Sequence, residues 1–329
     1  MPPAGPDPPS SLPPSSPSAP KHATAAPKGR RTIPFSELPA WRQENPDVRT
    51  GYRVTVDSWG ECLATVGAWH NETVNIWTHL LGALAAAALA GYLTYWTLVG
   101  SGGHGAEPFA RLAPFYGFPA SLGWRDTAVF AVFFLGSVVC FACSTLFHTS
   151  LCHREEVVKI TSRVDYLGIL TLGTLNFCPT LYYGFYCTPR LAYVYMALMA
   201  ASGTVGTFLV CAPRYNAPAH RRTRAATFVT LGAAALAPFV HALARLGAPE
   251  AARALALRLV GAELGAYLLG VVLYAERWPE AVWPGRFDFL GSSHQLFHVC
   301  SLVAVALHYV ATVEAFRYRH FDRLGVCAM

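Results

Sequence analysis

Seven long apolar stretches decide what this chain can fold into. A membrane-spanning helix needs about 20 mainly apolar residues, and these stretches lack the alternation typical of membrane β-strands. Only 13% of the residues are charged, whereas soluble proteins have roughly 25%. We therefore predict an all-α integral membrane protein, a bundle of seven transmembrane helices at residues 74–98, 127–149, 165–185, 191–211, 225–246, 255–275 and 294–315. Pro179 and Pro238 fall inside two of these stretches and predict kinks.

The rest of the chain divides into segments of different composition. Residues 1–32 are rich in Pro, Ser and Ala and have little apolar mass to bury, which predicts a disordered tail. Residues 33–73 carry several Trp and Tyr side chains, and we expect short amphipathic helices there, on the cytoplasmic membrane surface. The transmembrane domain then covers residues 74–315, and 316–329 form a short C-terminal tail.

The distribution of Lys and Arg predicts the orientation of the chain in the membrane. With a cytoplasmic N-terminus, 16 of the 25 Lys and Arg residues lie on the cytoplasmic side and 9 lie outside. Cytoplasmic segments carry an excess of positive charge, so we expect the N-terminus in the cytoplasm and the C-terminus outside. Asn71-Glu72-Thr73 has the sequence of an N-glycosylation site. This orientation places it in the cytoplasm, where it stays unmodified.

The nine cysteines show no regular spacing. Several lie within the apolar stretches, where a thiol usually acts as a small buried hydrophobe. The sequence therefore predicts no disulfide framework. Cys140 and Cys143 form a CxxC pair inside an apolar stretch, and buried thiols explain that pair better than a metal site does.

Polar residues from three of the stretches are expected to meet at one face of the bundle. Ser144 and His148 lie four residues apart at the end of the second stretch, and Asp165 opens the third. His294 and His298, again four residues apart, open the seventh. Because successive helices cross the membrane in alternating directions, these ends share one side, which is the cytoplasmic side in the predicted orientation.

Three imidazoles with one open position are typical of a catalytic zinc site. Two histidines four residues apart project from one helix face and can bind the same ion. We predict that His148, His294 and His298 bind Zn²⁺, which lowers the pKa of a bound water to about 7. Asp165 is expected to hold that water or to contact a ligand, and Ser144 to bond the water or a developing oxyanion. Asp165 and Ser144 are therefore the candidate catalytic residues.

Several ionisable residues have simpler explanations. A single His at a helix end is mostly an interfacial residue, and His79 and His241, inside the first and fifth stretches, are expected to form helix–helix hydrogen bonds. Glu263 lies well inside the sixth stretch, and an ionisable residue at such a position is a functional candidate. It can line a lipid-accessible cavity or proton route, pair with Arg258, or extend toward the membrane surface, and the sequence leaves these alternatives open.

Four spaced motifs resemble those of the progestin and adipoQ receptor family, which includes the haemolysin III-related proteins. They are "NETVNIWTHLLG" at 71–82, "STLFHTSLCHREEV" at 144–157, "DYLGI" at 165–169 and "SSHQLFH" at 292–298. Three further segments, "LYYGFYCTPR", "HRRTRA" and "ERWPEAVWPGRFD", resemble the adiponectin-receptor branch in particular. The resemblance runs from about residue 35 to about residue 320, in the same order.

The resemblance implies a seven-helix bundle with its N-terminus inside the cell. It implies zinc bound by His148, His294 and His298, with Asp165 linked to the ion through water and Ser144 close by. Some members of the family act as ceramide amide hydrolases and others as hormone or steroid receptors, and several affect zinc and lipid homeostasis.

Two principal hypotheses follow for the function. In the first, the chain is a receptor-like membrane protein that acts in lipid metabolism and zinc homeostasis signalling through zinc-dependent hydrolysis of a ceramide-type lipid amide. In the second, it is a hormone or lipid receptor whose zinc is structural, with four protein ligands if Asp165 binds directly. A zinc transporter is a weaker third, because transport needs a further site along a polar path.

Membrane lipids, with a sphingolipid substrate or a lipid or hormone ligand, are the expected partners. We expect no nucleic acid, because the basic residues are spread along the chain, and the sequence leaves a homo-oligomer open. The plasma membrane is the expected location, with the endoplasmic reticulum or another internal membrane as the alternative.

Overall fold

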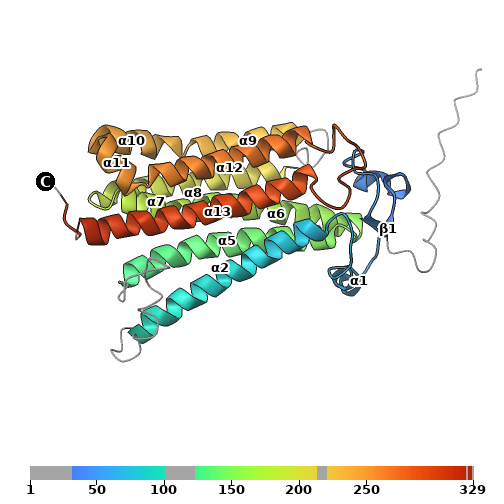
Figure 1. Ribbon diagram of the computed structural model, residues 1–329, viewed down its shortest axis with the longest axis horizontal. Coiled ribbons are helices and arrows are strands. Elements are labelled where there is room, and N and C mark those ends of the chain that lie inside the picture. The colour runs from blue at the N-terminus through green and yellow to red at the C-terminus, as the bar shows by residue number, and fades with distance from the viewer. Residues whose placement is uncertain (1–31, 101–122, 213–220, 324, 328–329) are drawn as a thin grey trace, which may run out of the picture. The chain divides into compact units, whose positions relative to one another are not determined.

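Long apolar helices make up most of the structure. The computed structural model describes residues 32–100, 123–212, 221–323 and 325–327, so the predicted disordered tail lies outside the described residues. Within these described ranges, five helices are long and apolar enough to cross a membrane. They are α2 (Thr73–Gly100), α5 (Trp124–Ser150), α8 (Pro189–Cys211), α12 (Leu257–Glu276) and α13 (Ser293–Arg317), and they run side by side along the bundle (Figure 1).

The third and fifth predicted spans are each divided into two helices. The pairs are α6 (Glu155–Leu175) with α7 (Phe177–Gly184), and α9 (Arg221–Ala233) with α10 (Leu236–Leu246). Pro179 and Pro238 are each the third residue of the second helix. Proline has no N–H to donate to the preceding turn, and the first turn of a new helix tolerates this. The regular helix is therefore broken for one residue before α7 and two before α10, although Asn176 and Ala235 keep right-handed helical dihedral angles. The all-α bundle is confirmed.

The helix that contains the third predicted span begins before that span. Helix α6 starts at Glu155, ten residues before Asp165, with Glu155 and Glu156 in its first turn, where carboxylates favour the helix N-terminus. Asp165 therefore does not open the helix but lies almost three turns inside it, and it is buried. The apolar pattern underestimates this helix because its first turns carry charged side chains.

The N-terminal segment contains less helix than predicted. Its only α-helix among the described residues is α1 (Trp59–Ala64), capped by the side chain of Ser58. The other elements are the 3-10 turns η1 (Phe35–Glu37) and η2 (Ala40–Arg42) and the antiparallel strands β1 (Thr32–Ile33) and β2 (Tyr52–Arg53). Pro34, Pro39 and Pro46 lie among these elements and prevent a continuous helix. The prediction of a series of amphipathic helices is therefore wrong for most of this segment.

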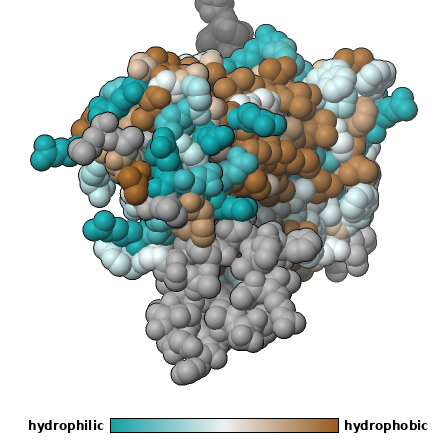
Figure 2. Space-filling view, turned by 60° about the vertical axis from the view of Figure 1, so that its left-hand side comes forward, coloured by the Kyte–Doolittle hydropathy of each residue, from teal (hydrophilic) through white to brown (hydrophobic). Residues whose placement is uncertain are grey.

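Helix α5 lies at the centre of the packing. It packs against α2 and α6, while α12 packs against α13. Phe130, Phe133 and Phe141 of α5 are almost fully buried in this core. Large apolar side chains of α8, α10 and α12 instead remain exposed, as on a surface that contacts lipid. Figure 2 shows apolar residues gathered along the flank of the bundle and hydrophilic residues toward the end that faces the viewer.

A disulfide joins the C-terminal segment to the end of the bundle. Cys187, between α7 and α8, bonds Cys327, which follows the π-helical turn η5 (Tyr318–Asp322). The short helix α11 (Ala248–Ala254) lies at the same end (Figure 1). The prediction of a chain without disulfides is therefore wrong for this pair. The two cysteines are 140 residues apart in sequence, and nothing in their spacing indicates that they meet.

We expect chemical labelling to count seven free thiols. The cysteines outside the disulfide are all free, although the sulfurs of Cys62 and Cys152 lie only 3.4 Å apart. Denatured, unreduced protein should therefore take up seven maleimide groups, and reduced protein nine, as measured by intact mass. The variant Cys327→Ser should take up eight without reduction, because it releases Cys187. Nine groups on unreduced wild-type protein would exclude the disulfide.

Candidate metal centre

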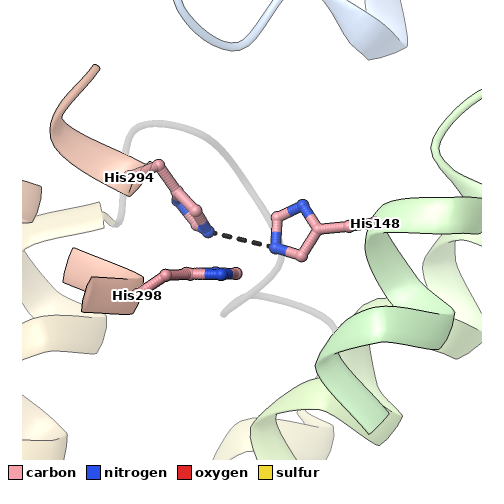
Figure 3. Close-up of side chains that lie close together, drawn as sticks. All are labelled: His148, His294 and His298. Atoms are coloured by element: carbon pink, nitrogen blue, oxygen red, sulfur yellow. Dashed lines mark hydrogen bonds between the residues drawn. The ribbon is translucent and has the colours of Figure 1, made fainter. Parts of the chain in front are cut away.

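Three histidines from two helices meet at one end of the bundle. His148 lies in the last turn of α5, while His294 and His298 occupy the first two turns of α13. One ring nitrogen from each lies within 4.8 Å of the others, and Nε2 of His294 is 3.2 Å from Nε2 of His148 (Figure 3). His148 and His298 are buried. This arrangement could hold a metal ion, as the sequence predicts for these three side chains.

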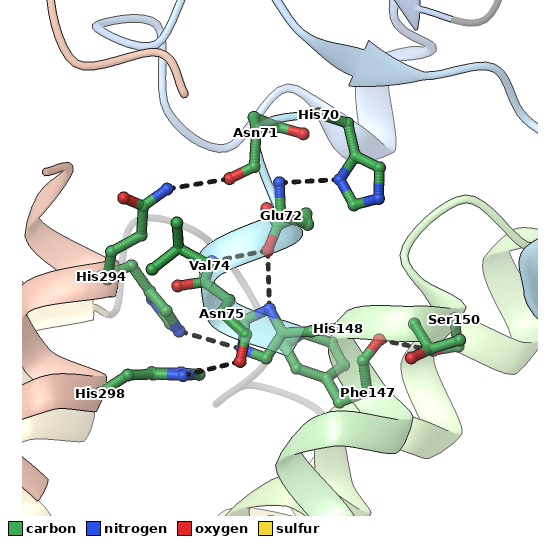
Figure 4. Close-up of polar contacts among 12 residues, drawn as sticks. His70, Asn71, Glu72, Val74, Asn75, Phe147, His148, Ser150, His294 and His298 are labelled. Atoms are coloured by element: carbon green, nitrogen blue, oxygen red, sulfur yellow. Dashed lines mark hydrogen bonds and ion pairs between the residues drawn. The ribbon is translucent and has the colours of Figure 1, made fainter. Parts of the chain in front are cut away.

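Glu72, directly before α2, and Asn75, in its first turn, orient two of the imidazoles (Figure 4). Nδ1 of His148 lies 2.7 Å from Oε2 of Glu72, and Nδ1 of His298 lies 3.2 Å from the main-chain oxygen of Asn75. Both acceptors favour a proton on Nδ1, so that each Nε2 carries a lone pair. Histidines that bind metal are usually oriented in this way by a carboxylate or a carbonyl. Converging lone pairs repel one another unless a cation lies between them, so this donor set fits a metal ion.

Glu72 is a site residue that the sequence analysis missed. It belongs to the "NETVNIW" motif, which indicated an N-glycosylation sequence and the family resemblance but no residue of the site. Burial acts to raise the pKa of Glu72, but the hydrogen bonds from His148 and Asn75 outweigh it and hold the pKa below its ordinary value. The signal available in the sequence was the spacing of Glu72 and Asn75, which places both on one face of the helix start.

Ser144 and Asp165 lie beside the three histidines. Both are buried, and Asp165 has the side chain of Ser144 as a hydrogen-bond partner. Both line the cavity that His294 and His298 also line. Among the described residues, however, the group close enough to share one ion contains the three histidines and not Asp165. The structure thus brings all five predicted residues together, with Asp165 outside direct reach of the position that the histidines share.

The cavity beside the centre is long and mostly apolar. Its volume is about 530 Å³, and it extends from the histidines along α6, α8, α9, α10 and α12. Its polar lining includes Ser144, Asp165, His294 and His298 together with His79 and Glu263, whereas His148 is not among the lining residues that the structure describes. Pockets for small organic ligands are typically apolar with a few converging polar groups. An acyl chain suits this lining.

His79 belongs to the same site, contrary to the prediction that it joins two helices by a hydrogen bond. Its ring stacks on that of His298 at 3.7 Å between centroids. It is buried, and neither of its ring nitrogens has a hydrogen-bond partner within the described part of the chain. A buried polar group without a partner is costly, so His79 is placed to contact a ligand in the cavity. His241, by contrast, does link helices, since its Nδ1 lies 2.7 Å from the hydroxyl of Tyr195.

The N-terminal segment fixes the end of α5. The buried guanidinium of Arg53 donates to the main-chain oxygens of His148 and Thr149. These carbonyls at the helix C-terminus would otherwise lack partners. The segment before α2 therefore helps to position His148. In the same segment, burial and, secondly, the charge of Arg53 lower the pKa of His70 to about 4, so that this side chain is neutral at pH 7.

We expect Asn71 to carry no glycan. The residue is buried, and its main-chain oxygen accepts a hydrogen bond from Gln295 at 3.1 Å. An oligosaccharide on this side chain would separate α2 from α13. Treatment of protein from eukaryotic cells with a peptide-N-glycosidase should leave its mass unchanged. A decrease in mass that the variant Asn71→Gln lacks would contradict both the burial and the predicted orientation.

Comparison with known proteins gives the family. The family model described as "Haemolysin-III related" matches residues 67–309. The chain is 34% identical to Progestin and adipoQ receptor-like protein 1 of Caenorhabditis elegans and 33% identical to Adiponectin receptor protein of Drosophila melanogaster. These matches cover 86% and 87% of this chain but only about three fifths of each relative, 61% and 60%. Heptahelical transmembrane protein ADIPOR1 of Oryza sativa is 30% identical, over 90% of this chain and 86% of that protein. The chain therefore belongs to the haemolysin III-related family of heptahelical membrane proteins, as its four motifs predict.

Proposed function

We propose that this protein is a receptor-like membrane hydrolase that cleaves a lipid amide with the help of Zn²⁺ bound by His148, His294 and His298. The observation that carries the proposal is the convergence of the three imidazoles at one end of a long apolar cavity. Ser144 and Asp165 line the same end. A metal-binding group, polar side chains and room for an acyl chain are thus combined in one place.

The donor set supports zinc as the metal. Neutral imidazole suits zinc, and three histidines with a fourth position left open are typical of catalytic zinc sites. When bound, the ion would polarise a carbonyl oxygen and lower the pKa of a coordinated water. Glu72 and Asn75 hold the rings of His148 and His298 in the orientation that this requires.

The remaining side chains have separate tasks in this proposal. Asp165 lies outside direct reach of the shared position, which suits a carboxylate that holds a water and accepts its proton. The single O–H of Ser144 orients Asp165 in the resting site. It would have to turn from the carboxylate to the oxygen of the scissile carbonyl to stabilise the charge that develops there. The apolar lining excludes bulk water from the acyl chain and so favours lipid over soluble amides.

A receptor with a structural metal is the second candidate function. Two relatives are named as receptors. A zinc ion between α5 and α13 would also stabilise one arrangement of the helices. Whether Asp165 binds the ion directly distinguishes the receptor from the hydrolase. A structural site usually has four protein ligands, whereas the three-histidine group of this chain does not include Asp165.

We further propose that the metal centre faces the cytoplasm and that the C-terminus lies outside. The positive-inside distribution supports this orientation. The disulfide between Cys187 and Cys327 supports it independently, because disulfides persist in oxidising compartments and are rare in the cytosol. The disulfide lies at the C-terminal end of α13 and the histidines at its N-terminal end. The two features would thus be on opposite sides of the membrane.

The variant Asp165→Asn tests the hydrolase directly. Wild-type protein reconstituted in lipid nanodiscs with zinc should release fatty acid from a ceramide, measured by mass spectrometry. We expect Asp165→Asn to lower this rate at least 100-fold, in the range of general acid–base catalysis, while zinc per chain stays within about twofold of the wild type. Ser202→Ala, which alters another hydroxyl in the cavity lining, serves as the control. Unchanged turnover in Asp165→Asn, or no turnover by zinc-loaded wild type on any long-chain amide, would favour the receptor.

A further inference from the structure

A second polar group lies deep in the cavity, away from the metal centre. Glu263 of α12 lines the cavity, and both of its carboxylate oxygens lie within 2.9 Å of Nδ1 of His308 on α13. Nε2 of His308 in turn lies 3.1 Å from the hydroxyl of Thr180 in α7. His308 and Thr180 are buried, and Glu263 is mostly buried. Of the alternatives left by the sequence, Glu263 therefore neither pairs with Arg258 nor extends toward the membrane surface.

The carboxylate of Glu263 can accept more hydrogen bonds than the protein gives it. A carboxylate offers about four lone-pair positions, and the single Nδ1–H of His308 is shared between the two oxygens. The cavity beside it is lined mainly by apolar side chains such as Leu264 and Val260. Tyr267, one turn further along α12, adds a hydroxyl that forms no hydrogen bond with Glu263 in the described part of the chain. A buried carboxylate with so few donors is costly. A ligand that brings a hydrogen-bond donor to this point would remove that cost.

The rise along α12 and α13 gives the distance between Glu263 and the metal centre. His308 follows His298 by ten residues on α13, a rise of about 15 Å. On α12, Glu263 precedes Tyr274, whose ring contacts that of His294, by eleven residues, a rise of about 16 Å. Measured along either helix, the pair of Glu263 and His308 therefore lies at about the same distance from the three histidines. In an extended fatty acid the C–C bonds are about 1.5 Å long, but the zigzag of the chain shortens the advance per bond. Carbon 12, eleven bonds from the carbonyl carbon, therefore lies about 14 Å from it.

We propose that the cavity is a binding site for lipids with two polar groups: an acyl carbonyl at the histidine centre and a hydroxyl near the middle of the chain, which donates to Glu263. This inference rests on the proposed function only in placing the acyl head at the histidines. His308 and Thr180 hold Glu263 in position, and the rest of the lining selects an alkyl chain. A hydroxyl fits better than an ether or a ketone, because the vacant positions at Glu263 are acceptors.

Three fatty acids of equal chain length test this specificity. We would measure the dissociation constants of stearate, 12-hydroxystearate and 12-methoxystearate for the zinc-loaded protein in lipid nanodiscs by isothermal titration calorimetry. Because a hydrogen bond to a charged acceptor contributes strongly, 12-hydroxystearate should bind roughly tenfold more tightly than stearate. The methoxy compound has a similar polarity but no donor, so it should bind no more tightly than stearate.

Variants of Glu263 decide whether the preference depends on this side chain. Glu263→Leu should abolish it with little change in stearate binding, and Glu263→Gln, which keeps the shape of the side chain, should reduce it at least threefold. Ser301→Ala is the control, because that cavity hydroxyl already donates to the main-chain oxygen of Phe297 at 2.9 Å. It should retain the preference in full. Zinc content and thermal unfolding of each variant verify that it is folded.

The possible failures are distinguishable. Equal binding of the three ligands to wild-type protein, or an unchanged preference in Glu263→Gln, would overturn the role of Glu263 and leave the proposed hydrolase intact. Failure of all three fatty acids to bind zinc-loaded wild type would instead contradict the acyl cavity itself, and with it the proposed function. Retention of the preference in a folded Glu263→Leu would also overturn the inference.

Discussion

Replacing both His294 and His298 by alanine is expected to reduce bound zinc from about one ion per chain to almost none. The two residues supply two of the three converging nitrogens, both from α13, and a single imidazole from His148 cannot retain the ion against a mild chelator. The measurement is zinc per protein by mass spectrometry on detergent-purified protein. Hydrolysis of lipid amide should be lost together with the metal.

The same variant should lose stabilisation by zinc. A metal that binds only the folded state stabilises it by about 4 kcal/mol at 1,000 times its dissociation constant. Added zinc should therefore raise the thermal unfolding temperature of chelator-treated wild type and leave that of the double variant unchanged. His241→Ala is the matched control, because this histidine lies within the bundle but bonds Tyr195 instead of the centre. If the double variant and the control retain equal zinc, the histidines of α13 are not its ligands.

The sequence predicted the metal centre because it depends on features that a chain carries locally. Spacing of four residues placed His294 and His298 on one helix face, and alternating helix directions brought His148 to the same end. The structure confirms that these residues meet. Each inference needed only helix periodicity and the order of the spans, and an error of a few residues at a helix end would not have changed it.

Features that depend on contacts between distant segments could not be predicted. Glu72 contacts His148 because α2 packs beside α5 in one particular rotation, and apolar periodicity does not fix that rotation in a helix with lipid on one side. The meeting of Cys187 with Cys327 depends on the path of the C-terminal segment. The start of α6, ten residues before Asp165, was missed for a different reason. Its first turns carry charged residues, which a pattern based on hydropathy does not detect.

The largest effect expected outside the ligands themselves is that of Glu72→Gln. The carboxylate accepts from Nδ1 of His148 at 2.7 Å and from Nδ2 of Asn75 at 2.7 Å. Both donors bond the same oxygen, Oε2, so the amide oxygen of a glutamine can take its place. The glutamine is, however, a weaker, uncharged acceptor for the imidazole and brings no negative charge to balance the ion. Loss of such an outer carboxylate typically weakens metal binding 10- to 100-fold. We expect an increase of that size in the zinc dissociation constant, measured by competition with a chelating dye, with little change in fold.

Glu61→Gln provides the comparison that isolates the effect of this contact. Glu61 is an exposed carboxylate of the same N-terminal segment, in α1, so its replacement removes the same charge without touching an imidazole. Zinc affinity should then stay within about twofold of the wild type, since exposed charges are screened by solvent. If both variants weaken zinc equally, the effect is one of overall charge, and the contact between Glu72 and His148 does not orient the ligand. If only Glu72→Gln weakens it, Glu72, directly before α2, orients His148 and belongs to the candidate metal centre.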